Sequence, residues 1–118
     1  MIKVEHLYKG FDGTPVLKDI SVEYEPGKCN MIIGASGSGK TVLLKNLIGL
    51  MQPDSGDIWY GDARMSDMTS KEKMKLRQRI GILFQGSALF DFATVIENVM
   101  FPMDFFTDWS AAQKKERA

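Results

Sequence analysis

The sequence predicts an α/β fold in which a core of parallel strands carries an antiparallel flank. Three observations support this class. Short apolar segments alternate with segments of helical periodicity along most of the chain. The first two apolar segments alternate apolar with polar residues, as half-buried antiparallel strands do. A glycine-rich loop then separates a mostly apolar segment from a helical one, which indicates a buried strand, a loop and a helix in succession.

The N-terminal elements form the antiparallel flank. Residues 2–7 (IKVEHL) and 16–24 alternate apolar and polar side chains, and FDGTP supplies the turn between them. After a Pro-Gly turn at 26–27, residues 29–34 (CNMIIG) predict a buried parallel strand. From residue 40 to 51 the apolar side chains follow one helical stripe, so a helix is expected there, with Pro53 ending it.

The later elements complete the alternation of strand and helix. A turn at 53–56 leads to a short strand at 58–60. A charged helix is expected at 70–78 and an apolar strand at 80–85, and the chain ends in a helical stretch. One domain, or a large piece of one, fits a chain of 118 residues with 44% hydrophobic content.

Composition limits the classes of partner. Fifteen Lys and Arg balance fifteen Asp and Glu, so no bulk positive field attracts nucleic acid, and the basic residues at 71–79 are typical of a solvated helix face. The single Cys29 forms no internal disulfide, and no signal peptide is visible, so a cytoplasmic setting is expected. No apolar segment approaches the roughly 20 residues of a membrane span, so contact with a membrane is expected only through a partner.

The chemistry of this sequence lies in a loop that fills GxxxxGK[ST] at every fixed position. Glycines keep side chains away, so successive backbone N–H groups converge on phosphate oxygens, and the following helix adds the positive end of its dipole. Lys40, also a catalytic candidate, places its charge on the β and γ phosphates, while the Thr41 hydroxyl is suited to ligate Mg²⁺. This Walker A motif predicts a nucleoside triphosphate site made of Gly34, Ala35, Ser36, Gly37, Ser38, Gly39, Lys40 and Thr41.

The segments around this loop resemble the ATPases of ABC transporters over essentially the whole chain. LLKNLIGLMQPDSGDI is similar to the family's Leu-rich helix and its Pro, acidic and Gly turn, and GILFQ is similar to its Q-loop strand. The resemblance implies a P-loop NTPase core of ABC type, with ATP and Mg²⁺ as cofactors. It implies as partners a second ATPase subunit and a membrane permease, which would hold the protein at the inner face of the membrane.

The resemblance also implies roles for single residues. Phe11 matches the aromatic that stacks on adenine, with Tyr8 as the competing candidate. Val16 and Thr14 are cofactor-binding candidates beside it, although a strand-core valine explains Val16 equally well. Gln85 matches the glutamine that reaches Mg²⁺ and the attacking water, so it is a catalytic and metal-binding candidate that also couples the site to the permease.

The segment after Gln85 is similar to a narrower group, the Mla-type ATPases of lipid importers associated with MCE proteins. GSALFDFATVIENVMFPM carries the ALF, ENV and aromatic-Pro features, although Gly86 and Ser87 stand in reverse order. This resemblance implies phospholipid as cargo and a permease that docks on the aromatic segment. Packing of one helix onto the sheet explains the apolar residues Val95, Val99 and Met100 as well.

Several family motifs are absent from the sequence. No LSGGQ-like signature or switch histidine is present, and the nearest Walker B lookalike, residues 88–91, has Phe92 where the catalytic Glu should be. We therefore expect a truncated core: residues 1–104 as its N-terminal part and 105–118 as the start of the helical subdomain. The parent is expected to hydrolyse ATP. The alternative, which we favour for the chain by itself, is an inactive fragment with weak or no nucleotide binding.

Overall fold

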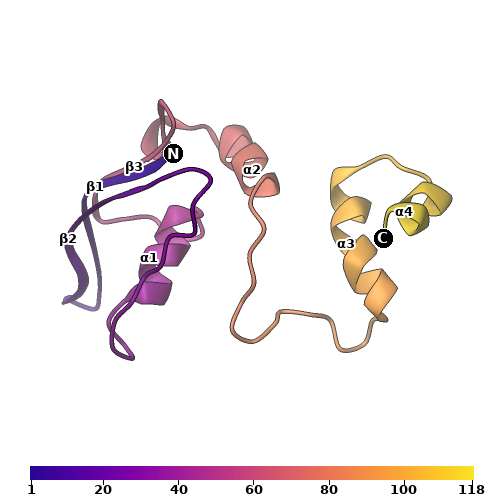
Figure 1. Ribbon diagram of the computed structural model, residues 1–118, viewed down its shortest axis with the longest axis horizontal. Coiled ribbons are helices and arrows are strands. Elements are labelled where there is room, and N and C mark those ends of the chain that lie inside the picture. The colour runs from indigo at the N-terminus through magenta and orange to yellow at the C-terminus, as the bar shows by residue number, and fades with distance from the viewer. The chain divides into compact units, whose positions relative to one another are not determined.

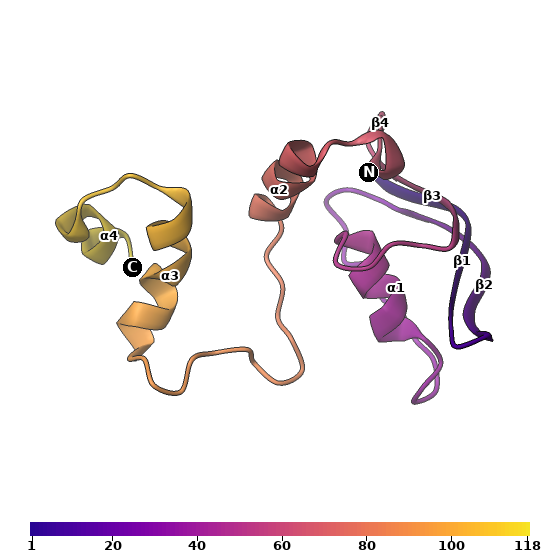
Figure 2. The same cartoon turned by 180° about the vertical axis from the view of Figure 1, so that it is seen from behind.

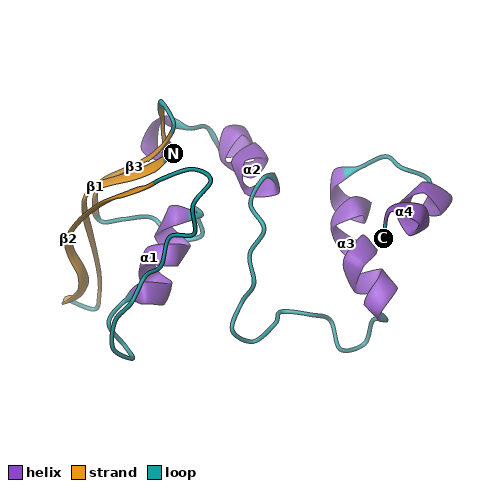
Figure 3. Ribbon diagram, viewed as in Figure 1, coloured by secondary structure: helices purple, strands orange, loops and turns teal.

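The computed structural model describes residues 1–118 and divides the chain into two compact units, residues 1–81 and 82–118 (Figure 1). The first unit holds the whole β-sheet and the helices around it, and the second is helical (Figure 3). No helix in the chain combines the length and apolar character that crossing a membrane requires. The boundary expected between residues 104 and 105 stays a prediction.

The sheet of the first unit is antiparallel throughout and has the order β2-β1-β3-β4. β1 and β2 form a hairpin in which Phe11 faces Thr14 across a two-residue turn. Both turn residues, Asp12 (φ 48°) and Gly13 (φ 77°), have the positive φ angles that such turns favour. The predicted antiparallel flank is confirmed in β1 (Ile2–Phe11) and β2 (Thr14–Tyr24), and the short strand predicted at 58–60 is part of β3 (Ser55–Tyr60). The two-residue strand β4 (Ala63–Arg64) was not predicted.

Helix α1 (Lys40–Leu47) closes a small core against this sheet (Figure 2). Its successive turns direct Leu43 and Leu47 inward, as the helical stripe predicts. The buried apolar cluster draws on both hairpin strands, β3, α1 and the short 3₁₀ helix η1 (Met65–Asp67), and consists of Val4, Leu7, Leu17, Leu43, Leu47, Ile58 and Met65.

The far end of α1 is fixed by a glycine and a tyrosine. Gly49 N–H donates to Asn46 O (3.0 Å) and Leu50 N–H to Lys45 O (2.9 Å), the paired bonds of a Schellman motif. The expected helix at 40–51 therefore ends at Leu47, before Pro53 is reached. The Tyr60 hydroxyl donates to Leu47 O, and burial raises the pKa of Tyr60 to about 12.

Helix α2 (Ser70–Gln78) completes the first unit. Leu76 packs against the apolar core, and the Arg77 guanidinium donates to Gly49 O (3.2 Å). α2 thus contacts the segment that leaves α1. The charged helix predicted at 70–78 is confirmed with the same bounds.

The second unit consists of α3 (Val95–Phe106) and α4 (Ala111–Arg117). Asn98 organises the segment before α3, because its amide oxygen accepts from Phe90 N–H (2.8 Å) and its amide nitrogen donates to Phe90 O (3.1 Å). Lys114 joins α4 to α3 through Asp104 (2.8 Å). The rings of Phe90, Phe101 and Phe105 are in consecutive contact, with centroids 4.7 and 4.8 Å apart.

Two predicted strands are wrong. Residues 29–34 and 80–85 contain no strand, and most of their apolar side chains are exposed, with Met31 81%, Ile33 83% and Leu83 86% accessible, whereas Ile32 packs against the core. A buried parallel strand needs hydrogen-bonding neighbours for its backbone, and no other segment of this chain pairs with either stretch. Apolar composition predicted the strands, but strand formation depends on partners as well.

Candidate functional site

The glycine-rich loop leads directly into α1. Gly39 is the residue that begins the helix, with a left-handed backbone (φ 95°), and its carbonyl accepts the first helical hydrogen bond from Leu43 N–H (2.8 Å). A turn inside the loop is closed by Ser38 N–H, which donates to Ala35 O (3.2 Å). The loop therefore passes into α1 through a left-handed glycine, with no side chain capping the helix.

Helix α1 differs from the other three α-helices in how it begins. α2, α3 and α4 each begin with a complete capping box, in which a Thr or Ser side chain and a Glu or Gln side chain satisfy the first backbone N–H groups. α1 has no side-chain cap, and the N–H groups of Gly39, Lys40 and Thr41 have no acceptor in the chain. Unpaired N–H groups at the positive end of a helix dipole suit an anion.

The Lys40 side chain curls back over the loop. Its ammonium donates to the carbonyl oxygens of Gly34 (2.7 Å) and Ala35 (2.6 Å), so the charge lies beside the loop and the helix N-terminus together. Thr41 follows in the first turn of α1 and is exposed. This donor set fits a triphosphate with Mg²⁺, because Mg²⁺ commonly takes few protein ligands and completes its shell with phosphate oxygens and water.

Gly39 also fixes the loop against the hairpin. A Cβ atom at this residue would lie 2.9 Å from Val16 Cγ1 and 3.1 Å from Leu17 Cδ2, so only glycine allows this approach. Val16, a cofactor-binding candidate, is therefore in the neighbourhood of the phosphate loop. The contact joins β2 to the start of α1, two elements that no local pattern in the sequence connects.

Phe11 lies at the end of β1, opposite Thr14, and 41% of its surface is exposed. The Lys9 ammonium lies over its ring, 5.5 Å from the centroid. The structure thus brings Phe11 and Thr14 together on the hairpin that also carries Val16. Tyr8 is also 41% exposed, so exposure does not separate the two aromatic candidates.

A residue that sequence reasoning missed fixes this end of β1. The Asp54 carboxylate accepts from Lys9 Nζ (2.6 Å) and from Gly10 N–H (2.7 Å), and Asp54 N–H donates to Tyr8 O (2.9 Å). Hydrogen bonds from Lys9 and Gly10 lower the pKa of Asp54. In the sequence Asp54 is visible only as part of a turn, and no local signal links it to residues far earlier in the chain.

Gln85 lies in the second unit, in a turn outside any helix or strand. Its catalytic and metal-binding role stays a prediction. The chain contains no cluster of three or more His, Cys, Asp or Glu side chains arranged to hold a metal ion.

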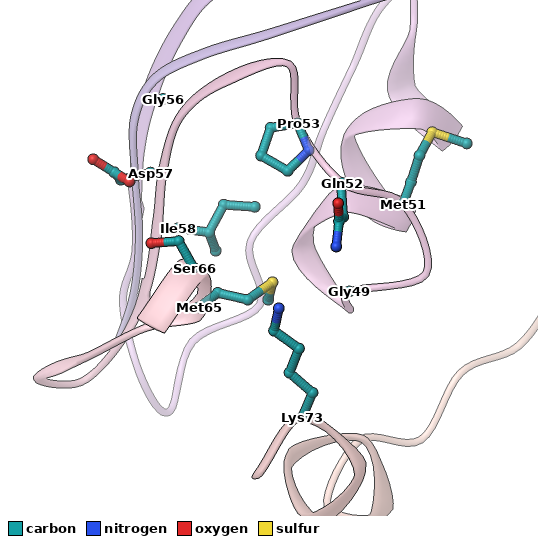
Figure 4. Close-up of a pocket in the computed structure, with 10 residues that line it drawn as sticks. All are labelled: Gly49, Met51, Gln52, Pro53, Gly56, Asp57, Ile58, Met65, Ser66 and Lys73. Atoms are coloured by element: carbon teal, nitrogen blue, oxygen red, sulfur yellow. The ribbon is translucent and has the colours of Figure 1, made fainter. Parts of the chain in front are cut away.

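A separate pocket lies in the first unit (Figure 4). Its volume is about 80 Å³, and apolar side chains such as Met51, Pro53 and Met65 supply much of its wall. Lys73 of α2 points into it (Figure 4). No residue from 34 to 41 lines this pocket, so it is distinct from the predicted nucleotide site.

The glycine loop, the uncapped helix and the antiparallel flank define a P-loop protein of the α/β class. The family described as "ABC transporter" matches residues 17–118, so the chain belongs to the ABC transporter family. Among similar solved structures is the dimeric, post-hydrolysis ATP-binding cassette MJ0796 bound to ADP and Pi, with a TM-score of 0.87 and 27% identity over 99% of this chain and 53% of that one. A second is cbiO1 from Clostridium perfringens, part of the transporter complex cbiONQ, with a TM-score of 0.80 and 34% identity over 98% of this chain and 46% of that one. The predicted fold class is confirmed.

The relatives that this chain resembles in sequence belong to different transport systems. The L-cystine transport system ATP-binding protein TcyN of Escherichia coli is 42% identical over 104 residues, which are 84% of this chain and 42% of that protein. The methionine import protein MetN of Carboxydothermus hydrogenoformans is 39% identical over 101 residues, 86% of this chain and 30% of that protein. The probable ribonucleotide transport protein mkl of Mycobacterium leprae is 34% identical over 102 residues, 86% of this chain and 29% of that protein. The chain thus spans less than half the length of these relatives, and their varied names support the family without favouring lipid importers.

Proposed function

We propose that this chain binds Mg-ATP through residues 34–41 as the nucleotide-binding part of an ABC-transporter ATPase subunit. The uncapped N-terminus of α1 carries the proposal. Three helices of the chain satisfy their first N–H groups with side chains, whereas the helix after the glycine loop leaves them free beside the Lys40 ammonium. The similar cassette MJ0796 holds ADP and Pi, which supports a nucleotide as the ligand.

Different residues bind different parts of Mg-ATP in this proposal. N–H groups of the loop and of the first turn of α1 donate to phosphate oxygens, which also gain from the helix dipole. The Lys40 ammonium leaves Gly34 O and Ala35 O for the β and γ phosphates, and Thr41 gives Mg²⁺ a hydroxyl ligand. Bound Mg²⁺ neutralises charge on the transferred phosphoryl group. Phe11 offers a ring to the adenine, with Val16 and Thr14 beside it.

In the complete subunit, we propose that Gln85 reaches the Mg²⁺ and attacking water and that a second ATPase subunit closes the site. The exposed aromatic segment after Gln85 is a surface for a permease, through which the protein sits at the cytoplasmic face of the membrane. A phospholipid cargo rests on the resemblance of residues 86–103 to Mla-type proteins alone. The names of the relatives, which cover cystine, methionine and ribonucleotide transport, offer other cargoes.

For the chain by itself we propose nucleotide binding without turnover. The competing outcome is weak or no binding, since residues 29–34, which lead into the loop, form no strand that would hold it rigidly. The geometry of residues 34–41 favours nucleotide binding, whereas the lack of a strand at residues 29–34 favours low affinity.

Calorimetric titration with Mg-ATP tests the proposal. We expect binding by the chain and its loss in Lys40→Ala, because one ammonium holds two phosphates. Lys45→Ala, in the last turn of the same helix, is the matched control and keeps the affinity. Equal binding by Lys40→Ala and the unmodified chain would contradict the site, and phosphate release above the level of Lys40→Ala would contradict binding without turnover.

A further inference from the structure

We infer that Asp54 positions Phe11 for the adenine by holding the Lys9 ammonium against one face of its ring. This inference rests on the proposed nucleotide site and adds to it a residue in the turn after α1. Asp54 touches no nucleotide in this proposal. It acts through Lys9 and through the backbone of Gly10, and so it is a positioning residue.

The first step is the fixed position of Asp54. Its carboxylate uses both oxygens on β1, one for Lys9 Nζ at 2.6 Å and one for Gly10 N–H at 2.7 Å, and its own N–H donates to Tyr8 O at 2.9 Å. Three consecutive residues of β1 are thus bound to one residue from another segment. Hydrogen bonds to a charged acceptor are stronger than neutral ones, so this is a firm attachment.

The second step leads from Lys9 to Phe11. The Lys9 side chain is only 16% exposed, and its ammonium lies 5.5 Å from the centre of the Phe11 ring, within the range of a cation–π contact. One face of the ring is therefore occupied by the ammonium. Phe11 remains 41% exposed, so part of its surface is open to a stacked base.

The third step links the two ends of the nucleotide site. α1 begins at the phosphate loop, and residues 48–54 connect its far end to β3. Asp54 in that connection binds the end of β1 that carries Phe11. At the other end of α1, Gly39 packs on Val16 of the same hairpin. The segments before and after α1 thus each contact the hairpin, Gly39 at Val16 and Asp54 at Lys9 and Gly10.

The hydrogen bond from Gly10 to Asp54 lies at an irregular point in the pairing of β1 with β2. The pairing of β1 with β2 shifts register between Lys9 and Gly10, so ladder hydrogen bonds are irregular just before Phe11. A Cβ at Gly10 would lie 2.8 Å from Thr14 O, so the two strands approach closely there. The Asp54 carboxylate supplies Gly10 N–H with an acceptor at this irregular point.

The test compares Mg-ATP with Mg-tripolyphosphate, which occupies the phosphate cradle but has no base. For Asp54→Asn and Lys9→Met we expect about three- to tenfold weaker Mg-ATP binding, because base stacking is partly lost, and an unchanged affinity for tripolyphosphate. Asp57→Asn is the matched control, since this carboxylate also binds a basic side chain, Arg64, at 2.6 Å, but lies away from Phe11. A structural role alone would lower both affinities equally.

A second measurement needs no nucleotide. In the free chain, the ε-methylene protons of Lys9 should be shielded by the Phe11 ring, and both Asp54→Asn and Phe11→Leu should return them to ordinary NMR shifts. Ordinary shifts in the unmodified chain overturn the inference, as does Asp54→Asn with unchanged Mg-ATP affinity in a chain that binds. If the unmodified chain binds neither probe, the proposed function fails and the positioning role falls with it, whatever the Lys9 shifts show.

Discussion

Gly39 carries two constraints in one residue, a left-handed backbone and a close approach to Val16. We expect Gly39→Ala to lower the free energy of unfolding by about 2 to 3 kcal/mol, because backbone strain of about 1 kcal/mol is added to overpacking. Urea denaturation followed by circular dichroism measures the loss.

The matched control is Gly27→Ala. Gly27 has a similar positive φ of 71°, but no atom lies within 4 Å of its added Cβ, so this variant should lose only about 1 kcal/mol. Shortening Val16 to Ala in the Gly39→Ala background should recover part of the stability. Equal losses for the two glycine variants would show that the contact with Val16 carries no energy.

At the scale of single residues, the sequence predicted local placement better than contacts between distant residues. The spacing of Gly34, Lys40 and Thr41 is local, so a motif reveals it and the structure places all three around one helix start. Asp54 was missed because its partner Lys9 lies 45 residues earlier, and no pattern in the intervening sequence records the pairing. The role of Gln85 stays a prediction for a related reason, since it lies in a different unit from the loop.

Among the elements, the capping boxes of α2 and α3, each of which contains a Glu, make stability depend on pH. Hydrogen bonds from the Thr94 side chain and backbone lower the pKa of Glu97, and Thr69 does the same for Glu72. A folded-state pKa below the unfolded value means that the stabilisation is complete at neutral pH and is lost as the pH falls through the lowered folded value.

We therefore expect the helical circular dichroism signal at 222 nm to fall as the solution is acidified from pH 7 to about pH 3. Part of this loss should disappear in Glu97→Gln, because glutamine keeps the hydrogen bonds but does not titrate. Glu116→Gln, outside every capping box, should leave the acid transition as it is. The idea fails if Glu97→Gln and Glu116→Gln give the same acid transition as the unmodified chain.

The helices and strands also show which elements can be predicted from local sequence and which cannot. Alternating polarity predicted the hairpin strands, and a run of charged, helix-forming residues predicted α2, since both signals act between near neighbours. Residues 29–34 and 80–85 have strand-like composition, but a parallel strand gains its hydrogen bonds from distant segments. Those bonds are not formed within this chain, so these residues remain irregular and most of them are exposed.

On the scale of the whole molecule, the exposed apolar side chains predict self-association. Leu83, Phe92 and Val95 are each more than 80% exposed, which is unusual for large apolar residues in a soluble chain. We expect light scattering to show dimers or larger species at micromolar concentration. Leu83→Ser combined with Phe92→Ser should lower the average mass, whereas the control Lys18→Ser should not. A monodisperse monomer in the unmodified chain would contradict the expectation.

The division into two units has an optical consequence. The chain has two tryptophans, and one falls in each unit: Trp59 on β3, where its indole N–H donates to Glu5 Oε2 (2.9 Å), and Trp109 before α4, 44% exposed. Trp109→Phe leaves an emission spectrum that comes from the sheet alone, and Trp59→Phe leaves one that comes from the helical unit alone. The molecule therefore carries its own pair of fluorophores, with which the melting of each unit can be followed separately without any attached dye.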